Sequence, residues 1–228
     1  MKAIYFMKTD YILTRKQIYT VPVFYILAVI VGTSTGSGEV SFLIASTYMM
    51  FVATIFSTAP FGTCVGKNKG FLLLLPATVK ERVTGRFLYG LSYIVVLALF
   101  CGLLSILYRL LGYEFSLLTM PVFLCEVAIS IALTAVEFLF FYVFGEGKGN
   151  WQYLSNIVRI APGMGMFFGG SYFLGELQES DVWSVGTDLE ALAGKLIQTG
   201  AIAVAAALLL TVAAAAVCMK VVERRDYA

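Results

Sequence analysis

The sequence predicts an all-α integral membrane protein with six transmembrane helices, an N-terminal interfacial amphipathic helix and a short cytoplasmic helix between the second and third spans. Three observations lead to this fold class. Hydrophobic residues make up 60% of the 228 residues and charged residues 13%, whereas soluble domains average about 45–50% and about 25%. The apolar residues fall into six segments, each about long enough to cross a bilayer, which takes ~20 residues. Lysine and arginine gather in alternate loops.

The N-terminal segment, residues 1–19, mixes apolar and cationic side chains. In a helical conformation, one apolar face would collect Ile4, Tyr5, Met7, Tyr11, Ile12 and Ile18. The cationic residues would lie largely off that face: Lys2, Lys8, Arg15 and Lys16. This pattern is typical of an amphipathic helix that lies in the membrane interface. A frayed basic tail is the alternative.

The spans form a single transmembrane domain over residues 1–228. We place them at residues 20–35, 41–64, 87–111, 119–144, 154–175 and 197–221. The first span is short, because its apolar run passes into "GTSTGSGE". The fifth is rich in glycine and contains Pro162, which predicts a kink or a break. The sixth is rich in alanine and has Thr211 as its polar residue, which predicts a packing helix.

The distribution of basic residues predicts the orientation of the chain. All of the 16 lysines and arginines except Arg109 and Lys195 fall on one side of this arrangement or towards it. Because basic loops stay in the cytoplasm, both termini are expected there, in a multi-pass protein of the cell (plasma) membrane. The acidic loop 176–196 is then extracellular. Thr187 and Glu190 within it have the spacing of a capping box.

Two acidic residues lie within the fourth span, where each charge costs a few kcal/mol unless it is paired or hydrated. Glu126 and Glu137 are 11 residues apart, about three helical turns, so they share a face. Arg109 lies at a depth where it could pair with Glu126, and Arg159 could likewise pair with Glu137. Two ion pairs that fix helix packing are the favoured interpretation. A polar face toward a substrate path or a proton relay is the alternative.

The fifth span carries a small-residue motif after Pro162. Gly165 and Gly169 form a GxxxG pair, and small residues at this spacing let helices approach closely. The motif predicts close packing either within the monomer or at the interface with a second subunit.

Composition excludes several classes of chemistry. The chain has no histidine, so a Ser/His/Asp triad or a Cys/His pair cannot be built. Its four cysteines have no CxxC spacing, so a zinc site or a disulfide framework is not expected. The stretch "GTCVGKN" has one residue too few between its glycines for a phosphate-binding loop, and Asn68 follows the lysine. No cofactor, metal, nucleic acid or ATPase motif of its own is therefore expected.

The loop 66–86 holds a short apolar run among basic residues. Phe71 to Leu75 are too few to cross a bilayer. Pro76 can start a short helix, since its missing N–H is unsatisfied at that position in any case, and Thr78 is a possible cap. Three residues, Val79, Val83 and Phe87, then recur at helical spacing. Lys80, Glu81 and Arg82 would remain solvated and available to a partner.

The stretch "LLLLPATVKERVTGRFLYG" resembles a pattern in the permease subunits of ABC-2-type transporters. The matching positions are Leu75, Pro76, Thr78, Lys80, Glu81 and Arg86. The charged tail "VVERRDYA", the layout of six spans and the N-terminal helix are also similar to those permeases. The chain departs from the pattern in having no acidic residue within 63–75.

The resemblance implies a membrane subunit of an exporter that pairs with a second permease subunit, as a homodimer or a heterodimer. Two separate ABC ATPase subunits would hydrolyse the ATP. The loop 66–86, with Arg82 beside the matching residues, would hold a coupling helix that docks on the ATPase.

Two other classes of function stay open. A secondary transporter or channel could use Glu126 and Glu137 as ion or proton sites, although no inverted repeat is evident. The other class is a non-transporting membrane scaffold, a sensor or a membrane-embedded enzyme. For a transporter, the apolar spans favour a lipid-like, peptide-like or amphipathic substrate over a small ion.

Overall fold

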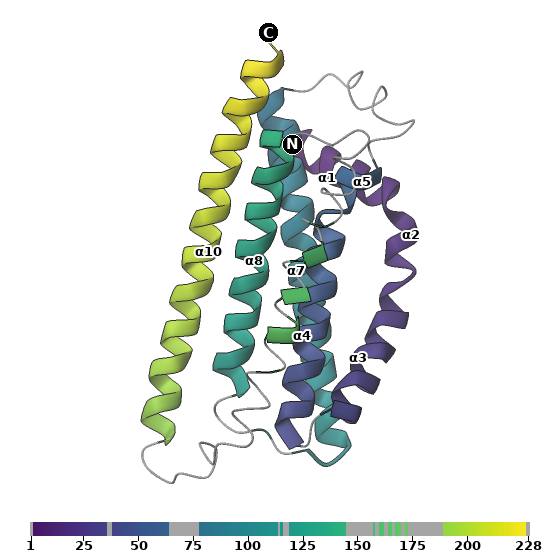
Figure 1. Ribbon diagram of the computed structural model, residues 1–228, viewed down its shortest axis with the longest axis vertical. Helices are drawn as coiled ribbons and strands as arrows, with labels where there is room; N and C mark the ends of the chain where they lie inside the picture. The colour runs from purple at the N-terminus through teal and green to yellow at the C-terminus, as the bar shows by residue number, and fades with distance from the viewer. Residues whose placement is uncertain are drawn as a thin grey trace.

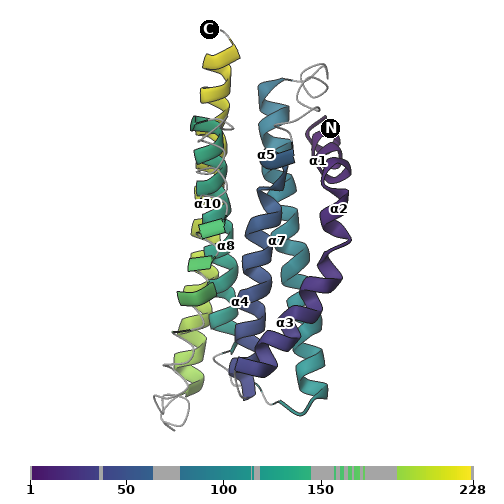
Figure 2. The same cartoon turned by 45° about the vertical axis from the view of Figure 1, so that its right-hand side comes forward.

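The computed structural model describes residues 2–35, 38–63, 78–113, 115, 119–144, 157, 160–161, 164–165, 167–169, 172 and 189–226. All regular secondary structure in these residues is helical. Long helices run roughly side by side, and both chain termini lie at the same end of the bundle (Figure 1). Helices α4 and α7 occupy the middle, between α8 and α10 on one side and α1 to α3 on the other (Figure 2).

Five helical stretches are long and apolar enough to cross a membrane: Arg15–Ser34, Val40–Phe61, Val79–Leu110, Thr119–Phe144 and Gly194–Arg224. They correspond to the first, second, third, fourth and sixth predicted spans. The predicted fifth span, 154–175, lies mostly outside the described residues. One residue of it that is described, Phe167, packs against Tyr48 and Phe51 of α4, with ring centroids 5.7 and 6.2 Å away. A sixth span therefore stays a prediction.

The N-terminal segment forms α1 (Lys2–Leu13) and α2 (Arg15–Ile18), which lead into α3 (Val21–Thr35). The prediction of a single apolar face on this segment is wrong. Met7 and Tyr11 of that set pack against the protein core, whereas Ile4, Tyr5 and Ile12 are exposed. The reason is that α1 packs along α7, and the face that it buries includes the polar residues Asp10 and, just past its end, Thr14.

Helix α4 (Gly38–Ser57) forms the centre of the core and contacts α3, α7 and α8. Several of its buried hydroxyl groups are paired within the helix, since Thr54 and Ser57 donate to the carbonyls of Phe51 and Thr54, whereas the buried Ser41 hydroxyl has no hydrogen-bond partner among the described residues. In hydrocarbon every polar group needs such a partner. Small hydroxyl residues therefore let neighbouring helices pack closely around α4.

The predicted second span, 41–64, is not one continuous helix. It breaks at Thr58 and continues as α5 (Ala59–Thr63). Pro60 explains the break, because proline has no N–H to donate to the carbonyl four residues earlier. That carbonyl belongs to Phe56, and it accepts a hydrogen bond of 3.3 Å from the Tyr89 hydroxyl of α7 instead.

Helix α7 (Val79–Leu110) begins well before the predicted start of the third span at residue 87. Residues 79–86 are therefore the first turns of a continuous membrane-spanning helix and not a separate coupling helix. The rest of the predicted coupling loop, 66–77, lies outside the described residues.

Helix α8 (Thr119–Phe144) has the bounds predicted for the fourth span. Helix α10 (Leu189–Asp226) starts within the predicted extracellular loop 176–196 and packs along α8. The buried residues of its contact face are small and include Ala207, Ala214 and Cys218. Thr187, the predicted cap, is outside the described residues.

Candidate functional site

The start of α7 is set by a capping box. The backbone N–H of Thr78 donates to Glu81 Oε2 at 3.0 Å, and the N–H of Glu81 donates to Thr78 Oγ1 at 3.3 Å. Both side chains therefore satisfy the otherwise unpaired N–H groups of a helix start. Lys80 is exposed, whereas Glu81 and Arg82 are half-buried. The prediction that all three are solvated holds for Lys80 alone. Leu75 and Pro76 lie outside the described residues.

Arg86, which is predicted to belong to the coupling loop, is bound to Asp10 of α1; its role in coupling stays a prediction. Its Nε lies 3.5 Å from Oδ2 of Asp10, and the two side chains are 17% and 5% exposed. The guanidinium group also lies over the ring of Phe61, 4.8 Å from its centroid. Burial raises the pKa of the Asp10 carboxyl, and the nearby charge of Arg86 and their hydrogen bond lower it by less.

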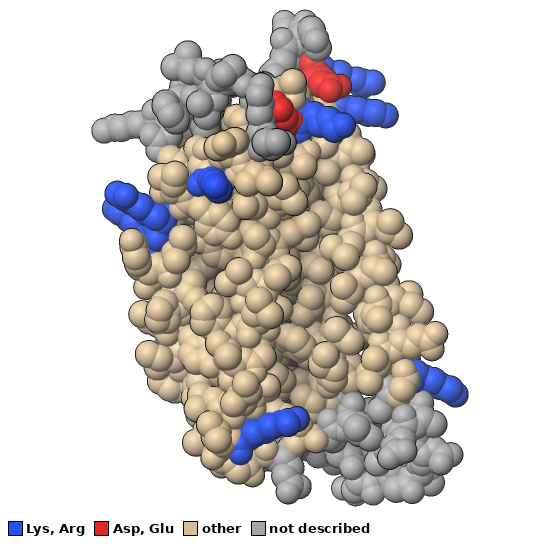
Figure 3. All heavy atoms as spheres, turned by 180° about the vertical axis from the view of Figure 1, so that it is seen from behind, with Lys and Arg blue, Asp and Glu red and all other residues tan. Residues whose placement is uncertain are grey.

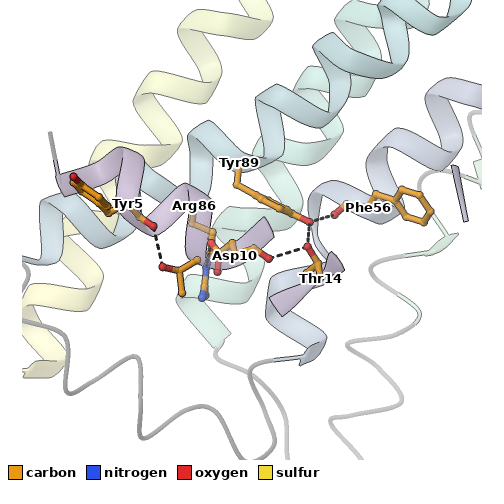
Figure 4. A network of polar contacts seen from close by, with 7 residues as sticks. Tyr5, Asp10, Thr14, Phe56, Arg86 and Tyr89 are labelled. Atoms are coloured by element: carbon orange, nitrogen blue, oxygen red, sulfur yellow. Dashed lines mark hydrogen bonds and ion pairs between the residues drawn. The ribbon is translucent and has the colours of Figure 1, made fainter. Parts of the chain in front are cut away.

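A chain of polar contacts continues from Asp10 into the core (Figure 4). The Thr14 hydroxyl lies 2.8 Å from the Asp10 carbonyl and 2.8 Å from the Tyr89 hydroxyl. Tyr89 in turn reaches the Phe56 carbonyl at the break between α4 and α5. Side chains from α7 thus connect the N-terminal segment to the end of α4.

Backbone contact reinforces this connection at Gly85. A Cβ atom at Gly85 would lie 2.6 Å from the carbonyl oxygen of Ala3 and 2.6 Å from Cβ of Phe6. Helix α1 therefore rests directly on the backbone of α7, at a spot that only glycine leaves free. About two turns further along α7, Tyr11 stacks on Tyr93 at a centroid distance of 5.3 Å, and its hydroxyl lies 2.6 Å from Ser92 Oγ.

We call this set of contacts the α1–α7 joint: Gly85, Arg86, Tyr89, Ser92 and Tyr93 of α7, with Ala3, Phe6, Asp10, Tyr11 and Thr14 of the N-terminal segment. Sequence reasoning did not identify Asp10, Thr14 or Tyr89 as members of a site. One signal was present, since Asp10 is the first acidic residue of the chain and stands in an otherwise cationic segment.

The intramembrane residues form a second polar cluster. Ser46 and Thr47 of α4 donate to the two carboxyl oxygens of Glu126 of α8, at 2.6 and 2.7 Å. The predicted ion pair between Arg109 and Glu126 is wrong. Arg109 lies over the ring of Phe115, 5.4 Å from its centroid. Glu126 is 6% exposed, and its carboxyl oxygens accept hydrogen bonds from Ser46 and Thr47.

Glu137 is buried in the same face of α8, with 1% of its surface exposed. Its predicted partner Arg159 lies outside the described residues, so that ion pair stays a prediction. Pro162 is also outside them. Gly165 and Gly169 are exposed, and a Cβ atom at either position would meet no atom within 4 Å. In the described part of the chain, the GxxxG pair therefore makes no close contact within the monomer.

The described residues include no group of three or more Cys, Asp or Glu side chains arranged to hold a metal ion. The contacts between helices in the two clusters are hydrogen bonds and, at Asp10 and Arg86, an ion pair. The α1–α7 joint lies at the end of the bundle that carries both termini, where most of the visible lysine and arginine side chains gather (Figure 3).

Comparison with known proteins identifies the family. The sequence profile of the family described as ABC-2 family transporter protein matches residues 6–223, nearly the whole chain. Comparisons with curated proteins and with solved structures gave no match. The matched family is the membrane-spanning, permease part of ABC transporters. With its bundle of apolar helices, this chain belongs to the ABC-2 family of transporter membrane proteins.

Proposed function

We propose that this chain is the permease subunit of an ATP-driven exporter, coupled to separate ATPase subunits at the start of α7. The family match over residues 6–223 carries this proposal. The position of the α1–α7 joint supports it, because the joint lies beside the segment that resembles the ATPase-docking region of ABC-2 permeases. ATP hydrolysis takes place in the partner chain.

The length of α7 supports docking at this place. Its 32 residues extend about 48 Å at 1.5 Å per residue, whereas the hydrocarbon core is about 30 Å thick. The helix therefore projects beyond the bilayer. Lys80 is exposed in its first turn and offers the cation that an acidic rim of an ATPase groove would attract.

The α1–α7 joint then passes ATPase movement into the bundle. A displacement of the first turns of α7 moves α1 through the Asp10–Arg86 ion pair and the contact at Gly85. The same displacement moves the end of α4 through the hydrogen bond from Tyr89 to Phe56. Three helices thus respond together to one docking event.

The basic residues support an orientation with both termini in the cytoplasm, and the ATPase must reach the same side. Gly165 and Gly169 support a second permease subunit, because this small-residue pair is exposed on the monomer and suits close approach of another helix. Homodimer and heterodimer are both compatible with the pair.

Site-specific crosslinking tests the docking site. A photo-reactive amino acid replaces Lys80 in one variant and Lys195 in the control, since both side chains are exposed and lie at opposite ends of the bundle. The permease is co-expressed with a candidate ABC ATPase from the same genome. We expect an adduct from residue 80 and none from residue 195. If the permease stimulates ATP hydrolysis but residue 80 forms no adduct, the docking assignment is wrong.

A further inference from the structure

A cavity of about 480 Å³ lies at the end of the bundle opposite the termini. Its walls come from the last turns of α7, the start of α8, and single residues of α4 and α10. This volume is within the range of about 300–1,000 Å³ that small-molecule sites occupy. It does not overlap with the α1–α7 joint.

The wall of the cavity is mainly apolar and partly aromatic. Phe42, Phe115, Phe123 and Met120 contribute most of the large side chains. Such a surface favours an alkyl chain over a polar ligand, because burial of apolar surface is the main source of affinity in sites of this kind.

One charged side chain completes the lining. Among the described residues that line the cavity, Arg109 alone is charged. Its guanidinium group is held over the Phe115 ring at 5.4 Å, and within the described part of the chain its donors form no ion pair. A guanidinium group presents a planar set of N–H donors that fits the oxygens of a carboxylate or phosphate.

Gly102 leaves space on the α7 wall. A Cβ atom at this position would meet no atom within 4 Å, although the residue lines the cavity. The absence of a side chain here keeps the cavity open, and a larger residue at this position would fill it from the side without displacing a helix.

We propose that this cavity binds a single-chain anionic amphiphile, namely a long-chain fatty acid, with its alkyl chain against Phe42, Phe123 and Met120 and its carboxylate at Arg109. We propose one chain and not the two chains of a phospholipid because the volume of about 480 Å³ lies in the lower half of the range of about 300–1,000 Å³ for small-molecule sites. The proposal does not depend on ATPase coupling, and it concerns binding by the permease alone.

The test uses the full-length permease, purified in an uncharged detergent without an ATPase. The probe is a palmitic acid analogue that carries a diazirine on its alkyl chain, and mass spectrometry locates the adducts. Unlabelled palmitate and hexadecanol compete with it at matched concentrations. We expect adducts on peptides that contain residues 101–123, and competition by palmitate at lower concentration than by hexadecanol.

Matched variants test separately the space beside Gly102 and the charge of Arg109. Gly102→Leu fills the cavity and should abolish labelling there, whereas Gly102→Ala should retain it. Arg109→Gln should weaken labelling about two- to fivefold, the range for an exposed charge pair, and Arg109→Lys should weaken it less. Gel filtration and the unfolding midpoint establish that each variant is folded.

Several results would overturn the proposal. Labelling of Gly102→Leu at the wild-type level would show that the chain does not occupy this cavity. Equal competition by palmitate and hexadecanol, or unchanged labelling in Arg109→Gln, would show that the head group is not recognised. If Gly102→Leu fails to fold, the Arg109 variants still decide the matter, because Arg109 is exposed at the end of α7.

Discussion

Replacement of Gly85 by alanine tests the α1–α7 joint most directly. The new Cβ would lie 2.6 Å from the Ala3 carbonyl oxygen and from Phe6 Cβ, and neither atom can turn away because one is backbone and the other is fixed to it. Ordinary contact begins at 3.4 Å, so α1 must retreat by about 0.8 Å (3.4 − 2.6) or more. The same retreat lengthens the Asp10–Arg86 contact, which is already 3.5 Å.

The magnitude follows from two opposing effects. Overpacking of a tight contact costs about 1–3 kcal/mol, whereas alanine in place of glycine within a helix gains up to about 1 kcal/mol. With that gain subtracted, Gly85→Ala should lose up to about 2 kcal/mol of stability, and it should be about 1–3 kcal/mol less stable than a Gly→Ala change that makes no such contact. Gly102→Ala in the same helix has the same gain and no contact within 4 Å, so it should be neutral or slightly stabilised.

Thermal unfolding in detergent measures the loss of stability, and stimulation of the partner ATPase measures the loss of coupling. Gly85→Ala should unfold at a lower temperature than Gly102→Ala and should stimulate ATP hydrolysis less. If the two variants unfold alike and stimulate the ATPase equally, α1 does not depend on close contact with α7, and the coupling route through the joint is refuted.

Four further substitutions test individual contacts. Arg86→Met should destabilise the fold by about 3–5 kcal/mol, because it leaves the Asp10 carboxylate buried without its partner, whereas Asp10→Asn should be much milder; unfolding midpoints compare them. Burial raises the pKa of the Asp10 carboxyl above its usual 3.8. The stability that the protonated carboxyl contributes is therefore fully present below pH 3.8 and is lost as the pH rises through the pKa of Asp10 in the folded protein. Asp10→Asn should remove this pH dependence of the unfolding midpoint. Tyr89→Phe should cost about 1–3 kcal/mol by leaving the Phe56 carbonyl unpaired, and equal midpoints for Tyr89→Phe and wild type would contradict that bond. Glu126→Gln should fold and transport nearly as well as wild type, and loss of transport in a folded variant would instead indicate an ion or proton site.

Five of the six predicted spans coincide with helices that are long and apolar enough to cross a membrane, because a bilayer requires about 20 apolar residues for each crossing. The bounds of α8 match the prediction, since apolar sequence and helix end together there. The start of α7 does not match, because a helix starts where its N–H groups are capped, and Thr78 and Glu81 provide that cap outside the apolar run. The break at Pro60 could have been predicted from proline's missing N–H alone.

Contacts between helices were harder to predict. Arg109 and Glu126 have compatible depths, but depth does not determine which neighbouring helix faces the carboxylate. The donors are Ser46 and Thr47 of α4, and nothing in local sequence distinguishes them from other small residues of the span. The contact of α1 with Gly85 could not be predicted for the same reason. A glycine in the sequence does not indicate which helix packs against it.

The continuity of α7 has a mechanical consequence. Arg86 at the α1–α7 joint and Arg109 at the cavity belong to one helix without a break, separated by 23 residues (109 − 86), or about 35 Å at 1.5 Å per residue. Such a helix acts as a stiff lever. A tilt of about 5° pivoting at Arg86 would carry Arg109 sideways by about 3 Å over that length. Small motions at the start of α7 would thus be enlarged at the far wall of the cavity.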